Sequence, residues 1–197
     1  MTRCFVAFEL AAESRQYLQE RVVPVHDALR AKRRWPVRLV RPQNWHATLL
    51  FFNDLSTQER DTVWQTVEMG ARDGAWRGLA FDWRGLEPWP NRRRPSMISL
   101  VGEDHPEARS WPVAGLLHRE PFSKADVRHY EPFRPHVTVM RFDSRWRKTL
   151  AADWAEISET LAPIDKSRIV LDHAAFFLST LSRDQPIYPR ERTIPLG

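Results

Sequence analysis

The chain has 197 residues, 42% of them hydrophobic and 11% aromatic, which is far too much apolar surface for a disordered chain. Its longest apolar runs are too short to cross a bilayer, the N-terminus enters a strand pattern with no cleavable leader, and the single Cys4 excludes internal disulfides and multi-thiolate metal sites. The net charge of +5 comes mostly from arginine, which favours polyanionic ligands. We therefore expect one soluble, cytoplasmic domain spanning residues 1–197, without a membrane or an obligate protein partner.

Strand and helix patterns alternate along the whole chain. In chain order, the pattern predicts a strand at 3–10, a helix at 11–34, an extended segment at 37–41, a turn at 42–44, a strand at 45–52, a helix after Ser56, strands at 79–86 and 96–101, a helix at 106–118, a strand at 136–141, a helix from Trp146 to Leu161, and strands at 168–178 and 188–196. Pro24 is expected to kink or break the first helix. Ser56 and Glu59 have the spacing of a capping box. Together these elements predict an α+β fold.

Two short segments repeat at matching points of the two halves. His46-Ala47-Thr48-Leu49 recurs as His136-Val137-Thr138-Val139, ninety residues later. Side chains at i and i+2 of a strand share a face, so each copy presents an imidazole beside a hydroxyl. A bare His-x-Thr is a weak signal, but both copies follow a turn with proline and open an apolar strand. The spacing predicts two similar lobes that face one cleft.

The chain resembles the 2H phosphoesterase superfamily, and within it the RNA 2',3'-cyclic phosphodiesterases also called 2'-5' RNA ligases. The resemblance runs through residues 3–8, 44–52, 133–141 and 188–196. It implies a bilobal fold with two antiparallel sheets lining a central cleft, helices outside, pseudo-twofold internal symmetry and no cofactor. Two departures are Asn53-Asp54, where the family has a turn containing glycine, and Trp45, where it has leucine.

The resemblance also implies roles for individual residues. It makes His46 the general acid and His136 the general base, although the residues alone leave this assignment open. It gives Phe51 and Arg141 contacts with the substrate. Strand parity, however, places both of these off the catalytic face unless a bulge re-aims them.

The chemistry explains why two histidines are needed. Opening a cyclic phosphate with water requires a base for the nucleophile and an acid for the departing ribose oxygen, and histidine serves in either role near neutral pH. Thr48 and Thr138 would donate hydrogen bonds to the non-bridging oxygens. No His-x-x-x-His pair or local group of histidine and carboxylate accompanies the motifs, so no metal site is expected.

The expected activity is therefore metal-independent hydrolysis of RNA 2',3'-cyclic phosphate ends to the 2'-phosphomonoester, with reversible 2'-5' ligation. RNA ends or small cyclic nucleotides are the expected partners. One alternative is a phosphodiesterase of the same superfamily acting on another cyclic or 2'-5'-linked nucleotide. Another is a non-catalytic module that binds RNA ends, although binding alone needs no acid and base pair. The remaining histidines are interpreted as structural, and Trp45 and Trp89 as candidates for the cleft rim.

Overall fold

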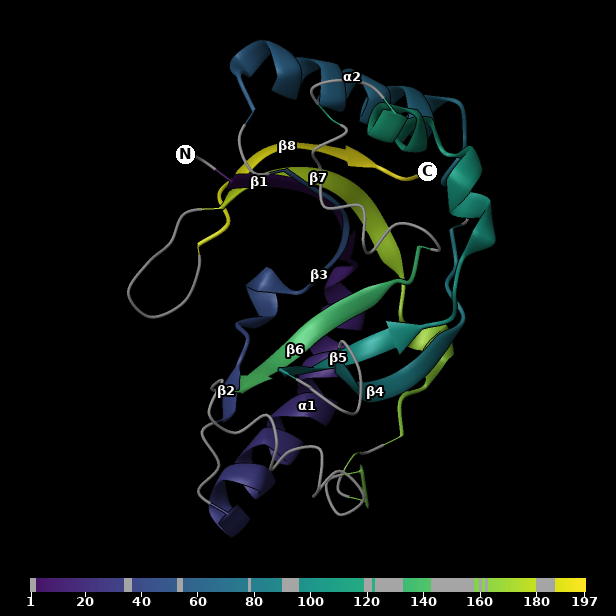
Figure 1. Ribbon diagram of the computed structural model, residues 1–197. Coiled ribbons are helices and arrows are strands. Elements are labelled where there is room, and N and C mark those ends of the chain that lie inside the picture. Colours follow the sequence, from purple (N-terminus) through teal and green to yellow (C-terminus); the bar gives the residue numbers. More distant parts are fainter. Residues whose placement is uncertain are drawn as a thin grey trace.

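The computed structural model describes residues 3–33, 37–52, 55–77, 79–89, 96–118, 122, 133–142, 158–159, 161, 163–179 and 187–197. Its helices and strands are β1 (Arg3–Leu10), α1 (Ala12–Arg33), β2 (Val37–Leu39), β3 (His46–Phe52), α2 (Thr57–Arg72), β4 (Trp83–Trp89), β5 (Met97–Gly102), β6 (His136–Phe142), β7 (Leu171–Ser179) and β8 (Arg190–Pro195) (Figure 1). Short 3-10 helices lie at Pro42–Asn44, Pro106–Ser110, Pro112–His118 and Lys166–Arg168. No helix among these residues is both long and apolar enough to cross a membrane.

The described strands form one eight-stranded antiparallel sheet. Its order is β4-β5-β6-β3-β1-β7-β8, and β2 pairs with β6. The register between β3 and β6 is a single pair, Ala47 opposite Val137. Farther along β6, residues 140–142 pair with β2. β3 thus leaves β6 after this pair and continues beside β1. The two sheets expected from the sequence are therefore one, because this pair connects them.

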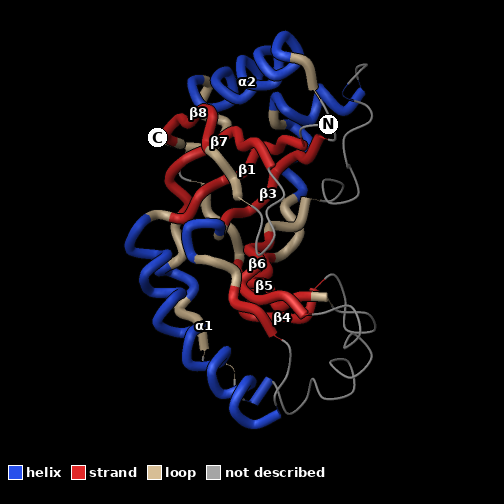
Figure 2. The backbone as a smooth tube through the Cα atoms, turned by 90° about the vertical axis from the view of Figure 1, so that its left-hand side faces the viewer, coloured by secondary structure: helices blue, strands red, loops and turns tan. Residues whose placement is uncertain are grey.

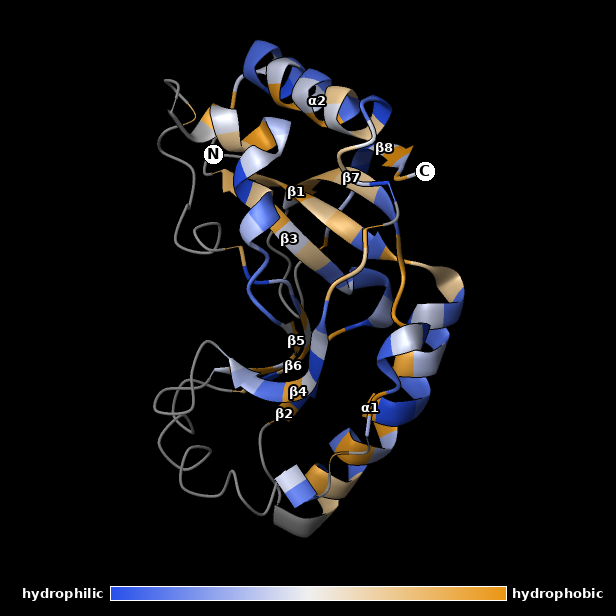
Figure 3. Cartoon of the chain, turned by 90° about the vertical axis from the view of Figure 1, so that its right-hand side faces the viewer, coloured by the Kyte–Doolittle hydropathy of each residue, from blue (hydrophilic) through white to orange (hydrophobic). Residues whose placement is uncertain are grey.

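The helices cover the outer surfaces of the sheet. α2 lies over β8 and β7 at one end of the molecule, and α1 lies near the opposite end, behind β6 and β2 (Figures 1 and 2). Apolar residues of both helices pack in one core with the strand residues that point toward the helices. The helix residues of this core include Leu18 and Val22 of α1 and Val63 and Val67 of α2. Figure 3 shows hydrophobic residues along β1 and β7, which are buried over most of their length.

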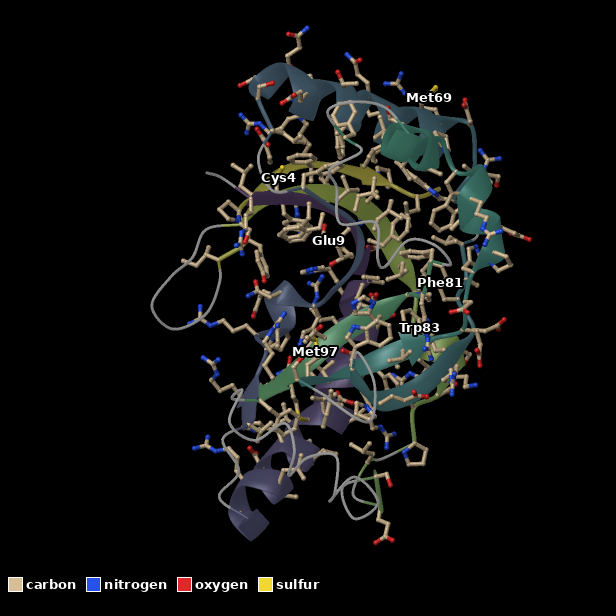
Figure 4. The ribbon with its side chains drawn as sticks, viewed as in Figure 1. Cys4, Glu9, Met69, Phe81, Trp83 and Met97 are labelled. Carbon is tan, nitrogen blue, oxygen red and sulfur yellow. The ribbon has the colours of Figure 1, made fainter. Side chains whose placement is uncertain are left out.

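Alternation along β1 separates two faces of the sheet. Cys4, Val6 and Phe8 point into the main core, as the sequence predicts, whereas Phe5 and Ala7 belong to a second, smaller cluster on the other side. Figure 4 shows Cys4 on the α2 side of β1 and Glu9 on the side that faces β6. We call this second side, which carries both His-x-Thr motifs, the histidine face.

The capping box is confirmed, because the Ser56 amide donates to the Glu59 carboxylate (2.6 Å) and the Glu59 amide donates to the Ser56 hydroxyl (3.3 Å). α1 continues through Pro24 instead of ending there. The ring of Pro24 is exposed while Val22 and Val25 are buried, so the missing hydrogen bond lies on the water side of the helix.

Two predicted elements differ from the structure. β4 begins at Trp83, later than the predicted 79–86, because its pairing with β5 runs from Trp83 opposite Gly102 to Trp89 opposite Met97. The single helix predicted over 106–118 is two 3-10 helices, and the second begins at Pro112, whose missing N–H interrupts a continuous helix. The helix predicted from Trp146 lies outside the described residues, apart from its last few positions.

Gly102 ends β5 at a point where no side chain fits. Its amide donates to the Pro135 carbonyl (2.8 Å), and an added Cβ would lie 2.6 Å from Pro135 Cγ. We predict that Gly102→Ala lowers the free energy of unfolding by about 1–3 kcal/mol, because Pro135 must move. The control is Gly115→Ala, where a Cβ would meet nothing within 4 Å. Urea denaturation of both variants checks this prediction, and equal midpoints would contradict it.

Candidate active site

The two His-x-Thr motifs meet at the junction of the two halves of the sheet. β3 begins with His46 and β6 with His136, and Ala47 and Val137 are the antiparallel pair between them. Counting one residue on either side of this pair places each histidine opposite the threonine of the other motif. The two histidines and two threonines are partly exposed, whereas Ala47 and Val137 are buried in the core. Strand geometry therefore brings the four predicted polar residues to one place.

Both motif strands contain an extra residue directly after the threonine. On β3, Thr48 pairs with Ala7 and Leu50 with Val6, so Leu49 is unpaired in the register. On β6, Val139 has the corresponding place between Thr138, opposite Ser99, and Met140, opposite Ile98.

These matching bulges reverse the alternation at the same point of both strands. Leu49 and Leu50 are both buried in the main core, and so are Val139 and Met140. The next residues, Phe51 and Arg141, consequently turn to the histidine face. Phe51 packs against the small cluster around Phe5, and Arg141 acts electrostatically on His46. Strand parity alone gives the wrong face for both residues.

Aromatic side chains surround the imidazole of His46. The rings of Phe5 and Phe177 stack on it with centroids at 4.8 and 5.8 Å, and the ring of Tyr188 stands edge-on at 5.5 Å. Sequence reasoning did not select these three residues. The alternation of β1 and β7 could have found Phe5 and Phe177, since both lie on the histidine face.

Burial among these rings lowers the pKa of His46 from its ordinary 6.5 to about 4. A hydrogen bond with the Asn44 backbone opposes this effect by favouring the charged ring. The charge of Arg141, and that of His136 when it is protonated, lower the pKa of His46 further. His46 is therefore neutral in the free protein near pH 7.

The imidazole of His136 is held differently. Its Nδ1 lies 3.1 Å from the carbonyl oxygen of Arg134, and its ring stacks on Trp89 with centroids 4.1 Å apart. A carbonyl only accepts hydrogen bonds, so Nδ1 carries the proton and the neutral ring keeps its lone pair on Nε2. Nearby, the Thr138 hydroxyl donates to Met97 Sδ (3.3 Å).

A partly buried ion pair lies beside His46 on the same face. Glu9 is opposite His46 in the register, its side chain is 7% exposed, and it accepts a hydrogen bond from Arg190 at 2.6 Å. Arg190 itself is half exposed. No local sequence pattern indicates this pair, because its members are 181 residues apart.

The other sequence candidates are not in contact with His46 or His136 in the described residues, or lie outside those residues. Trp45 is 1% exposed in the main core, so its interpretation as a rim residue is wrong. Among the described histidines, His26 and His173 contact the neighbouring Asp27 and Asp172, and His105 packs among aromatic rings. His129 lies outside the described residues. In the described part of the chain, no three His, Cys, Asp or Glu side chains are grouped closely enough to hold a metal ion.

The low pKa of His46 predicts a pH dependence of stability. As pH falls from about 6.5 to about 4, the unfolded chain binds a proton at this residue and the folded chain does not, so the free energy of unfolding decreases. We expect this component to be on the order of 2 to 3 kcal/mol and to be absent in His46→Gln. Urea denaturation of both proteins between pH 4 and 8 measures it. Parallel pH curves would contradict the assignment.

Comparison with known proteins finds relatives along the full chain. No family model matches. The chain is 26% identical over 199 residues to the RNA 2',3'-cyclic phosphodiesterase of Aquifex aeolicus (strain VF5), a match that covers 100% of this chain and 98% of the relative.

Solved structures show the same fold. TT0787 of Thermus thermophilus has a TM-score of 0.59 and 21% identity, and the match covers 98% of this chain and 97% of that one. E. coli LigT in its apo form has a TM-score of 0.52 and 20% identity, with coverage of 98% and 96%. The chain is therefore similar over its full length to a protein named as an RNA 2',3'-cyclic phosphodiesterase, and it shares the fold of TT0787 and LigT.

Proposed function

We propose that this protein hydrolyses RNA 2',3'-cyclic phosphate ends to 2'-phosphomonoesters without a metal ion, and that it catalyses the reverse 2'-5' ligation weakly. The observation that carries the proposal is the meeting of two His-x-Thr strands at the Ala47–Val137 pair. Two histidines on one face supply the two proton transfers that the reaction needs. The name of the Aquifex relative supports the choice of substrate.

The internal symmetry of the site is part of this proposal. Strands β3, β1 and β7 on one side correspond to β6, β5 and β4 on the other, with a bulge at the same point of both motif strands. We propose that the chain is one domain of two similar halves, with a substrate cleft between them. A pseudo-twofold axis through the Ala47–Val137 pair would present the imidazoles to opposite sides of one phosphate.

His136 is the general base in this mechanism. Its Nδ1–H donates to the Arg134 carbonyl, which leaves the lone pair on Nε2 to take a proton from water. The water oxygen forms a bond to phosphorus while the bond from phosphorus to the ribose 3' oxygen breaks. The products are a 2'-phosphomonoester and a free 3'-hydroxyl.

His46 is the general acid, and the substrate itself makes it one. The free protein holds this ring neutral, with a pKa of about 4. A cyclic phosphate carries a negative charge, and an adjacent anion raises the pKa of an imidazole. Substrate binding is therefore coupled to proton uptake at His46, and that proton then passes to the departing 3' oxygen.

The remaining site residues bind the phosphate. The hydroxyls of Thr48 and Thr138 donate to its non-bridging oxygens. When Thr138 donates to the phosphate, it loses its hydrogen bond to Met97 Sδ. Thioether sulfur is a weak acceptor, so the loss of this bond costs little free energy. Arg141 offsets the phosphate charge from β6, and Phe51 packs beside the aromatic cluster around His46.

A second candidate function is phosphodiester hydrolysis in a small nucleotide. Solved structures of E. coli LigT contain 3'-AMP, ATP or phosphate, so a protein of this fold accommodates mononucleotides. Comparing kcat/KM for a cyclic-phosphate oligonucleotide with that for 2',3'-cyclic mononucleotides separates the two candidates. Preference for the mononucleotides would favour the second.

We predict that His46→Ala and His136→Ala each lower kcat on an oligonucleotide with a 2',3'-cyclic phosphate end by about 100-fold or more, because each removes one proton transfer. Thr48→Ala and Thr138→Ala lower kcat less.

The assay contains excess EDTA, which we expect to leave wild-type turnover unchanged, and the expected product is the 2'-phosphomonoester. The control is His26→Ala, a histidine on α1 that contacts Asp27. Near-normal turnover by either motif variant, or rescue of EDTA-treated enzyme by a divalent ion, would refute the mechanism.

A further inference from the structure

Trp89, the last residue of β4, lies directly against the imidazole of His136. The two ring centroids are 4.1 Å apart and the planes differ by 18°, which is a parallel stack. In the register Trp89 is opposite Met97, so its indole reaches across β5 to touch a residue of β6. Trp89 is 8% exposed, and its ring is therefore held by packing.

Arg134 holds both rings of this stack. Its carbonyl accepts from His136 Nδ1, and its guanidinium lies 5.5 Å from the centroid of the Trp89 ring. The same guanidinium is fixed by a bond from Nε to the Gly102 carbonyl at 3.3 Å. The stack thus restricts tilting of the imidazole out of its plane, and the Nδ1 bond restricts rotation within the plane.

Both constraints decide which nitrogen of His136 faces the reaction. A ring flip about χ2 would break the Nδ1 bond and leave a partly buried carbonyl without its partner, and the ring would have to turn out of its stack on Trp89 during the flip. Loss of the stack alone removes one of the two barriers to this motion. Small misplacements of an acid or base reduce catalysis strongly, by as much as 100-fold for about 1 Å.

We propose that Trp89 is a positioning residue for His136: it holds the imidazole in the tautomer and orientation that present Nε2 to the attacking water. This role rests on the proposed function for its kinetic consequence, but the orientation itself is a property of the free protein. The indole face also stabilises the imidazolium that forms when His136 takes a proton, through a cation–π interaction.

The test combines ring NMR with kinetics. In ¹⁵N-histidine-labelled protein at about pH 9, where unperturbed imidazoles are neutral, wild type shows His136 protonated at Nδ1 alone. Trp89→Phe keeps a stacked ring and this single tautomer. Trp89→Leu gains a population protonated at Nε2, and its kcat falls by about 10-fold or more while KM changes by less than about threefold.

Trp83→Leu is the matched control. Trp83 begins the same strand, is 1% exposed and packs edge-on against Phe81 at 5.7 Å, and Figure 4 shows these two side chains together. Its loss destabilises the core but leaves the His136 tautomer unchanged. The proposal is overturned if Trp89→Leu keeps the pure Nδ1–H tautomer, or if Trp83→Leu changes the tautomer and kcat equally. A wild-type protein that shows the tautomer but turns over no cyclic phosphate would refute the proposed function and leave the positioning role standing.

Discussion

The arrangement of the site depends on one backbone pair, Ala47 opposite Val137. Both residues are small or branched apolar side chains at 0% exposure, and they anchor the junction in the core while their neighbours face the other way. The pair fixes the register of the two motifs, and a slip by one residue would turn both histidines toward the helices. The bulges at Leu49 and Val139 then bring Phe51 and Arg141 to the same face.

The two imidazoles differ in what surrounds them, and this difference suits two opposite roles. His46 is enclosed by Phe5, Phe177 and Tyr188, so its charged form is unfavourable until an anion arrives. His136 is oriented by a carbonyl and an indole, so its lone pair has a defined direction. In the proposed mechanism, His46 becomes an acid when the substrate binds, and His136 acts as the base.

Much of this could be predicted from sequence, because strand periodicity and the repeated motif are local signals. The strands beginning at Arg3, His46 and His136, the capping box at Ser56 and the burial of Cys4 follow from residues close together in the chain. The environment of the histidines could not be predicted in the same way. Trp89 was expected only at the cleft rim, and its stack on His136 was not predicted. The Glu9–Arg190 pair joins strands far apart in the chain, and no local pattern encodes a bulge that depends on the neighbouring strand.

The central claim is that His46 and His136 flank a single phosphate, and a crystal structure with a bound 2'-nucleoside monophosphate tests it most directly. One imidazole nitrogen should lie on each side of phosphorus, with the two nitrogens separated by about 5 to 8 Å, which is two hydrogen-bond lengths plus the phosphate between them. The hydroxyls of Thr48 and Thr138 should contact the non-bridging oxygens. A phosphate that contacts only one of the two histidines, or that binds away from the Ala47–Val137 junction, would show that the two histidines do not act on one phosphate.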